Sequence, residues 1–227
     1  MDSLKNDISI DLSQQSLPGF IAIEGSIGVG KTTLARRLAT SFNYDTLLEL
    51  AEENPFLERF YQQGTSAALA TQLFFLFQRV RQLQELRQRD MFAPVRVADF
   101  LIDKDPLFAQ VTLDPHELDL YRKVYEQLAV DAPTPDLVIY LQAPTEVLLE
   151  RIQRRGTPME QNISREYLAA LNEAYTQFFY YYDQAPLLIV NATEIDLVNC
   201  AEDYKNLVDY LLTVKSGRHY YNPAPHI

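Results

Sequence analysis

An eight-residue motif near the N-terminus, Gly25–Thr32 with the sequence GSIGVGKT, constrains the fold of this chain more than any other feature. It matches the pattern G-x-x-x-x-G-K-[ST], with an apolar segment before it and a helical pattern after it. Glycines let such a loop curl until its N–H groups converge on an anion-sized hollow, and the helix that follows adds the positive end of its dipole. The motif therefore predicts a phosphate-binding loop between a strand and a helix.

Loops of this kind hold nucleoside triphosphates. We expect Lys31 to reach the β- and γ-phosphates of ATP, and the hydroxyl of Thr32 to hold Mg²⁺. The motif does not identify the phosphate acceptor, because GTPases, motors and kinases share it, and a chance glycine-rich turn is the alternative interpretation. The residues predicted to bind ATP are Gly25, Ser26, Ile27, Gly28, Val29, Gly30, Lys31, Thr32 and Thr33.

Apolar segments and helical patterns alternate along the chain. The segments predicted to be buried strands are Phe20–Glu24, Thr46–Glu49, Val95–Asp99, Leu137–Leu141 and Leu187–Val190. The helical patterns cover Lys31–Phe42, Ala68–Arg89, His116–Ala129, Pro144–Arg155 and Arg165–Asp183. This alternation predicts a three-layer α/β fold of the P-loop NTPase type, with a five-stranded parallel sheet and helices on both faces. Ligands of such sheets bind at the carboxyl ends of the strands.

The charge balance bears on the partners of the chain. Its 227 residues include 31 acidic and 20 basic side chains, for a formal net charge of -11. We expect no nucleic-acid partner, because a nucleic-acid backbone is held by Lys and Arg side chains that displace counterions. The one cysteine, Cys200, cannot form an intrachain disulfide, which suits a reducing cytoplasm.

The ends of the chain predict its domain organisation. Residues 1–17 are polar and lack the apolar core of a signal peptide, and no apolar run approaches the ~18 residues of a membrane span. We therefore expect a cytoplasmic protein without a membrane partner. It would consist of a flexible N-terminal tail (1–17), one domain (18–213) and a C-terminal tail (214–227).

Six stretches carry a resemblance that covers nearly everything from Phe20 to about Val198. They are FIAIEGSIGVGKTTLARRL, ENPFLERFYQQ, TQLFFLFQRVRQL, VADFLIDKDPLFA, LVIYLQAPTEVLLERIQRRG and SREYLAALNEAY. In order and spacing they resemble the deoxynucleoside kinase family, and most closely its bacterial deoxyadenosine/deoxyguanosine kinase branch. The resemblance implies transfer of the γ-phosphate of ATP to the 5′-hydroxyl of a purine deoxynucleoside in nucleotide salvage. It also implies a homodimer.

Glu49 ends the second predicted strand, where the family places the carboxylate that takes the proton from the 5′-hydroxyl. An alcohol attacks better with a carboxylate within hydrogen-bond reach. The family often has Pro-Val after this Glu, whereas Leu50 and Ala51 follow here. Glu52 and Glu53 are close in sequence, but the strand-end position favours Glu49. An exposed Glu at the end of a strand is the alternative.

The resemblance also implies contacts to the deoxynucleoside. Tyr61 matches a tyrosine that hydrogen-bonds the sugar 3′-hydroxyl, and Gln72 a glutamine whose amide pairs with the base. Arg79, two helical turns beyond Gln72, would read or steady the base. Glu160 matches a glutamate of the lid that contacts the 3′-hydroxyl. The alternative for the helical residues is a polar position on an amphipathic helix.

Asp99 ends the third predicted strand, where the family has an acid that helps to organise Mg²⁺. An arginine usually follows that acid, but Phe100 and Leu101 follow here, so the arginine is absent. Lys104, five residues beyond Asp99, is the candidate to supply the missing charge. A solvated lysine in an acidic loop is the alternative.

Arg151 and Arg155 lie four residues apart, so both share one helix face, and the stretch resembles the arginine-rich lid of the family. Guanidinium groups there would stabilise the charge of the transferring phosphate. A third arginine of the family is absent at Thr157. The alternative is a helix end whose cations complement its dipole. The resemblance places the ATP adenine against about Asn191–Asp196.

Two other functions fit the phosphate loop. A nucleoside-monophosphate kinase such as thymidylate kinase needs an arginine beside its acceptor phosphate. The acceptor side here offers Glu49, Tyr61, Gln72 and Glu160, which suit a neutral sugar and base. A non-catalytic subunit built on this fold would be expected to lose its loop lysine, its base or its lid arginines. All of these are present, so both alternatives are disfavoured.

Overall fold

The structure is a computed structural model that describes residues 16–89, 96–128, 133–196 and 200–223. Its strands are β1 (Phe20–Gly25), β2 (Asp45–Leu47), β3 (Arg96–Ala98), β4 (Leu137–Gln142), β5 (Leu187–Asn191) and β6 (Arg218–Tyr221). Its α-helices are α1 (Lys31–Phe42), α2 (Leu57–Gln63), α3 (Ala68–Arg89), α4 (Asp105–Thr112), α5 (Pro115–Leu128), α6 (Thr145–Arg155), α7 (Arg165–Tyr181) and α8 (Ala201–Leu211). Short 3₁₀ helices, η1 to η4, cover Ala51–Glu53, Gly64–Ala67, Ile102–Lys104 and Pro158–Asn162.

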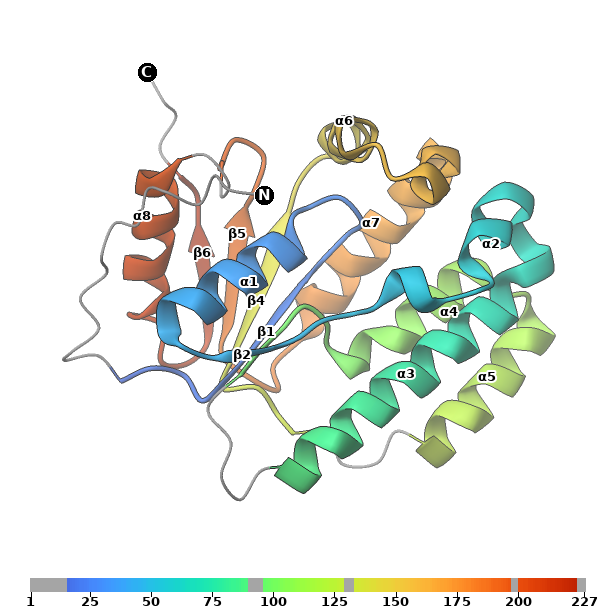
Figure 1. Cartoon of the computed structure of the whole chain (residues 1–227), viewed down its shortest axis with the longest axis horizontal. Coiled ribbons are helices and arrows are strands. Elements are labelled where there is room, and N and C mark those ends of the chain that lie inside the picture. Colours follow the sequence, from blue (N-terminus) through green and yellow to red (C-terminus); the bar gives the residue numbers. More distant parts are fainter. Residues whose placement is uncertain (1–15, 90–95, 129–132, 197–199, 224–227) are drawn as a thin grey trace.

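The strands form one parallel sheet in the order β2-β3-β1-β4-β5-β6. Helices cover it on both faces, with α8 on one side and α3, α4, α5 and α7 on the other (Figure 1). The predicted fold class is confirmed. Because β1 lies between β3 and β4, the loop that follows it emerges from the middle of the carboxyl edge, where ligands of parallel sheets bind.

A sixth strand was missed by the prediction of five. β6 pairs with β5 and lies within residues 214–227, which were predicted to be a tail. Its sequence, RHYY, is half-exposed and lacks the continuous apolar run of an inner strand, so it gave no strand signal. Part of the predicted C-terminal tail therefore belongs to the sheet. Most of the predicted N-terminal tail, residues 1–15, lies outside the described residues.

The five predicted helices are present: α1 and α3 have the predicted bounds, and the bounds of α5, α6 and α7 differ from the prediction by one or two residues. The last residue predicted for α5, Ala129, lies outside the described residues. Three helices were not predicted: α2 and α4, of 7 and 8 residues, and α8, of 11 residues. Two of them are too short to show a clear helical period in the sequence.

Alternate residues of the central strand face opposite layers of the molecule. Ile21 and Ile23 pack with side chains of α1 and α8, whereas Ala22 packs with side chains of α7. Glu24 continues this alternation toward α7 and is 0% exposed. A carboxylate in that place requires charged or hydrogen-bonding partners, because burying it alone would be costly.

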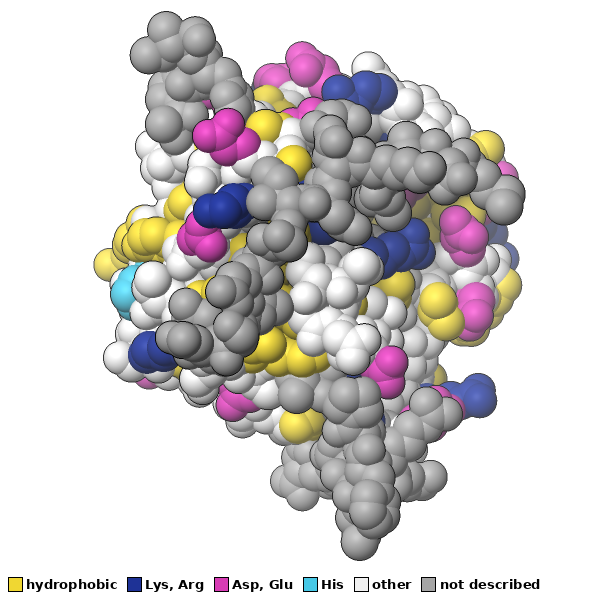
Figure 2. Space-filling model, turned by 60° about the vertical axis from the view of Figure 1, so that its left-hand side comes forward, with side chains coloured by type: hydrophobic (Ala, Val, Ile, Leu, Met, Phe, Trp, Pro, Cys, Tyr) yellow, Lys and Arg dark blue, Asp and Glu magenta, His cyan; other side chains and the backbone are white. Residues whose placement is uncertain are grey.

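The surface carries charges of both signs. On the face drawn in Figure 2, Lys and Arg side chains are interspersed with Asp and Glu. Within the described ranges, none of the helices combines the length and the apolar content that crossing a membrane requires.

Arg218 links the missed strand to the end of α7. One of its guanidinium nitrogens donates to the carbonyl oxygens of Phe179, Tyr180 and Tyr182, at 3.0, 2.8 and 3.1 Å. These carbonyls lie at a helix end, where intrahelical partners are lacking. We expect Arg218→Ala to lower the free energy of unfolding by about 1 kcal/mol, measured by chemical denaturation.

The matched control for this change is Arg165→Ala. Arg165 pairs with Glu146 at the surface, with both side chains more than half exposed. Exposed pairs contribute roughly 0–1 kcal/mol, so this variant should stay close to the wild type. Equal losses in the two variants would contradict a special role for Arg218.

Candidate active site

The loop between β1 and α1 is closed by its own lysine. Lys31 is the first residue of α1, and its Nζ donates to the carbonyl oxygens of Gly25 and Ser26, at 2.7 and 3.2 Å. Gly28 has a φ of 84°, and a Cβ there would lie 2.8 Å from Cγ1 of Ile152 on α6. The loop therefore packs directly on α6 and requires glycine at this position.

The surroundings of the loop suit a nucleotide. Burial lowers the pKa of Lys31, and the charge of Lys104 lowers it further, so an added anion would be favourable there. The Ser26 hydroxyl is buried and has no hydrogen-bond partner among the described residues. A cavity of about 680 Å³ lies between residues 28–33, α6 and residues 193–196, a size that fits a nucleotide. It reaches most of the segment predicted to hold the adenine.

Asp99 connects the loop to Glu49. Its Oδ2 accepts a hydrogen bond from Oγ1 of Thr32 at 2.5 Å, and its Oδ1 accepts one from the N–H of Glu49 at 2.7 Å. Thr32 and Asp99, which were predicted to hold Mg²⁺ together, are thus in direct contact. Both offer oxygen atoms, the ligands that Mg²⁺ prefers.

Glu49 lies two residues beyond the end of β2, although it was predicted to be the last residue of that strand. The strand ends earlier because the backbone N–H of Glu49 bonds to the side chain of Asp99 instead of to a neighbouring strand. The carboxyl ends of β2 and β3 still bring the two acids together.

Arg79 joins Glu49 to a second buried acid, Asp105. Its guanidinium forms ion pairs with both carboxylates, and it is 4% exposed. Burial alone would raise the pKa of Glu49, but the charges of Arg79, Lys104 and Lys31 outweigh it and lower that pKa to about 2. Burial raises the pKa of Asp105 to about 6 in spite of Arg79. Arg79, which was predicted to read the base, is thus in contact with the predicted catalytic base.

Lys104 is fully buried, so the alternative of a solvated loop lysine is excluded. Its Nζ lies 3.2 Å from Oε1 of Glu24 and 3.9 Å from Oε2 of Glu49. Glu24 also accepts hydrogen bonds from the N–H of Leu101 at 2.5 Å and the hydroxyl of Tyr175 at 2.9 Å. This network, which we call the Glu24 network, holds a positive charge beside Glu49.

Tyr61, one of the predicted deoxynucleoside contacts, lines a second cavity. This cavity has about 310 Å³ and lies between α2, α4 and α7, with Tyr61, Thr112 and Tyr167 in its wall. Nε2 of Gln72 lies 3.3 Å from Oγ1 of Thr112. Burial raises the pKa of Tyr61 well above its usual range, and Tyr167 and Glu160 add to the shift. The Tyr61 hydroxyl therefore stays protonated and can hydrogen-bond a sugar hydroxyl.

The arginines of α6 line the larger cavity. Arg151 donates to the carbonyl oxygens of Val29, Ala192 and Thr193, at 3.3, 2.7 and 3.2 Å, so it holds the loop to the end of β5. Arg155 pairs with Glu160 at 2.5 Å, which brings two residues of the predicted lid together. Arg154, which the sequence reasoning did not assign, lies in the same wall.

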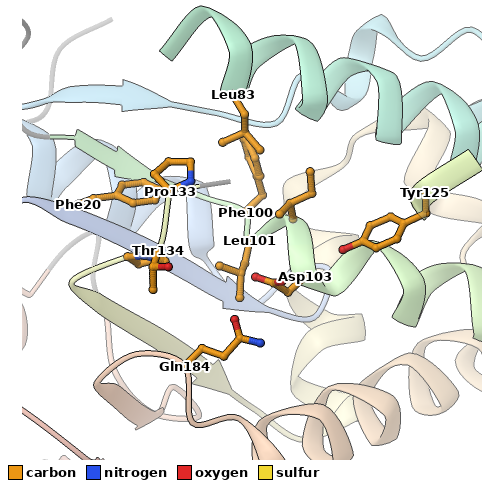
Figure 3. A pocket seen from close by; sticks show the side chains of 11 residues that line it. Phe20, Leu83, Phe100, Leu101, Asp103, Tyr125, Pro133, Thr134 and Gln184 are labelled. Atoms are coloured by element: carbon orange, nitrogen blue, oxygen red, sulfur yellow. The ribbon is translucent and has the colours of Figure 1, made fainter. Parts of the chain in front are cut away.

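A third, smaller cavity lies near the amino end of β1 (Figure 3). It has about 120 Å³, and the Tyr125 hydroxyl points toward Asp103, whose pKa is raised by burial. None of the residues around it was predicted to bind ATP or a deoxynucleoside. The candidate site therefore consists of the two larger cavities and the charges between them.

Phosphoryl transfer to an alcohol needs a cradle for the donor phosphates and an ionised carboxylate near the acceptor hydroxyl. The loop supplies the first and Glu49 is available for the second. The loop lies at the middle of the carboxyl edge of a parallel sheet and leads into a helix N-terminus, which is where a P-loop binds phosphates. The fold and the site therefore define a P-loop phosphotransferase.

The comparison with known families narrows this class. The deoxynucleoside kinase family matches residues 21–214, so the chain belongs to that family. It is an ATP-dependent deoxynucleoside kinase, which transfers phosphate to the 5′-hydroxyl of a deoxynucleoside. This activity is favoured over that of a nucleoside-monophosphate kinase or a non-catalytic subunit.

Similar proteins include a deoxyguanosine kinase of Bacillus subtilis (strain 168), 41% identical over 69% of this chain and 76% of that protein. A deoxyadenosine kinase of Dictyostelium discoideum is 34% identical over 77% of this chain and 73% of that protein. Among solved structures, a deoxyadenosine kinase from M. mycoides with the products dCMP and a flexible dCDP bound gives a TM-score of 0.75. It is 27% identical and covers 86% of this chain and 100% of that one.

Besides Arg154, sequence reasoning missed four residues that contact the predicted site: Glu24, Asp105, Thr112 and Tyr167. One signal was present, since Glu24 is a charged residue within an otherwise apolar strand. The other three are ordinary polar or aromatic residues of helices, which only the packing of α4 and α7 brings to the site.

Substitutions in the Glu24 network can distinguish a structural role of Lys104 from a catalytic one. Lys104→Met leaves the carboxylate of Glu24 buried without its countercharge, and we expect the free energy of unfolding to fall by about 3 kcal/mol. Adding Glu24→Gln removes the unpaired charge and should recover most of that stability. Phosphate transfer should remain at least about tenfold below wild type in both variants, because the charge beside Glu49 is gone.

Denaturation curves and transfer rates of the two variants check this prediction. A double variant that regains both stability and activity would show that Lys104 acts through folding alone.

Proposed function

We propose that the acceptor is a purine deoxynucleoside, deoxyguanosine or deoxyadenosine, and that the enzyme serves nucleotide salvage. The observation that carries the proposal is the buried side chain of Gln72, 5% exposed, whose amide contacts Thr112 in the wall of the 310 Å³ cavity. An amide offers a hydrogen-bond donor and an acceptor side by side, as the edge of a purine does. The deoxyguanosine and deoxyadenosine kinases to which the chain is similar support the same preference.

Glu49 is the proposed base. With a pKa of about 2 its carboxylate is ionised throughout the physiological range, so it accepts the proton of the 5′-hydroxyl as the oxygen bonds to the γ-phosphorus. The bond from the γ-phosphorus to the bridging oxygen breaks, and ADP leaves. A low pKa does not prevent this role, because in a loose transition state the proton departs late.

Thr32 and Asp99 are the proposed Mg²⁺ ligands. Their contact at 2.5 Å gathers hydroxyl and carboxylate oxygens beside the phosphate loop. This small donor set suits a cation that is bound by one or two protein groups together with substrate phosphates. The bound ion would neutralise the charge of the β- and γ-phosphates.

Arg151 and Arg155 are proposed to stabilise the transferring phosphate and to help exclude water, since a kinase site open to water would hydrolyse ATP. Arg155 can leave Glu160 for the phosphate, because its side chain is half-exposed. Glu160 would then turn to the sugar 3′-hydroxyl together with Tyr61. Gln72 and Arg79 would hold the base, and Lys104 would supply the charge of the absent arginine.

A homodimer in the cytoplasm is also proposed, on the resemblance to the family and the single cysteine. A homodimer has twice the chain mass of 26.1 kDa, which light scattering of the purified enzyme measures directly. A mass of one chain would contradict the proposal.

The test is phosphate transfer from ATP and Mg²⁺ to each of the four deoxynucleosides, with wild type and Glu49→Gln side by side. We expect the highest rates on deoxyguanosine or deoxyadenosine. The variant should lose about 10²–10⁴-fold in kcat, because its amide cannot accept the proton.

Glu52→Gln is the matched control, since Glu52 is an exposed acid three residues from Glu49. It should retain the wild-type rate. A wild type that prefers pyrimidines would contradict the purine proposal, and a fully active Glu49→Gln would contradict the base.

A further inference from the structure

Thr112 ends α4 and stands between the helix and Gln72. Its Oγ1 lies 2.8 Å from the carbonyl oxygen of Phe108 and 3.3 Å from Nε2 of Gln72. It also lines the 310 Å³ cavity with Tyr61 and Tyr167. The side chain of Gln72, which would face the base, is therefore held by Thr112, a residue that takes no part in the phosphate transfer itself.

The hydroxyl of Thr112 fixes the orientation of the Gln72 amide. A hydroxyl has one proton, and here the shorter contact, to the carbonyl oxygen of Phe108, takes it. Its lone pairs are then directed at Gln72, so only the NH₂ end of the amide can bond to it. An amide turned by 180° would place its oxygen against the oxygen of Thr112.

A fixed amide can distinguish two kinds of purine. A 6-amino purine presents a donor at position 6 and an acceptor at N1, whereas a 6-oxo purine presents an acceptor at position 6 and a donor at N1. A glutamine free to turn serves both orders equally well. A glutamine whose NH₂ end is held in place forms two hydrogen bonds with the purine whose donor and acceptor match its amide. With the other purine it would place donor against donor and acceptor against acceptor.

We propose that Thr112 is a specificity-determining residue, which selects between 6-amino and 6-oxo purine deoxynucleosides by fixing the amide orientation of Gln72. The proposal rests on the proposed acceptor class and deepens it. Thr112 acts through Gln72 and not on the reacting atoms, so it is a positioning residue. Removing its hydroxyl should bring the two purines closer in rate.

The test is a competition between deoxyadenosine and deoxyguanosine in one reaction, for wild type, Thr112→Val and Thr112→Ser. The ratio of the two monophosphates formed gives the ratio of the kcat/KM values, and it does not depend on how much of a variant is folded. Valine has the shape of threonine without its hydroxyl, and serine keeps the hydroxyl.

We expect Thr112→Val to shift the product ratio toward unity by about 3- to 10-fold, the size of one hydrogen bond, and Thr112→Ser to keep the wild-type ratio. An unchanged ratio in Thr112→Val, or an equal shift in Thr112→Ser, would overturn the inference. A wild type that phosphorylates neither purine would overturn the proposed acceptor class itself, so the two failures are distinguishable.

Discussion

The carboxylate of Asp99 is the interaction on which the site depends. One of its oxygens bonds to the first turn of α1 and the other to the backbone of Glu49, so a single side chain sets the spacing between the phosphate loop and the proposed base. This is possible because β3 lies between β1 and β2 in a parallel sheet. Strand order, and not the conformation of one loop, therefore determines how donor and acceptor groups face each other.

Around this contact the molecule buries several charged side chains, namely Glu24, Arg79, Lys104 and Asp105. Burying an ion costs several kcal/mol unless opposite charges and hydrogen bonds compensate it. Glu24 pairs with Lys104, and Asp105 pairs with Arg79. The positive charges of Lys104 and Arg79 keep Glu49 ionised, although burial alone would favour its protonated form. The buried charges that oppose folding of the site are also the charges that set the ionisation state of Glu49.

The sequence predicted the features that depend on local order. The phosphate loop, the five predicted strands and a site at the carboxyl edge of the sheet follow from a motif, apolar runs and the geometry of parallel sheets. The ion pair of Glu24 with Lys104 joins residues 80 positions apart, and the Gln72–Thr112 contact joins two helices, so both depend on packing that no periodicity records. β6 was missed because a half-exposed edge strand has no continuous apolar run.

The position of β6 has a consequence for synthesis. Because the ribosome makes the chain from its N-terminus, the phosphate loop and the strands around it leave the ribosome before β6, the last strand of the described residues. Until β6 arrives, β5 presents the unpaired N–H and C=O groups of an open sheet edge, which can pair with another chain. The nascent enzyme is thus open to aggregation at the edge farthest along the sheet from Glu49 until β6 covers that edge.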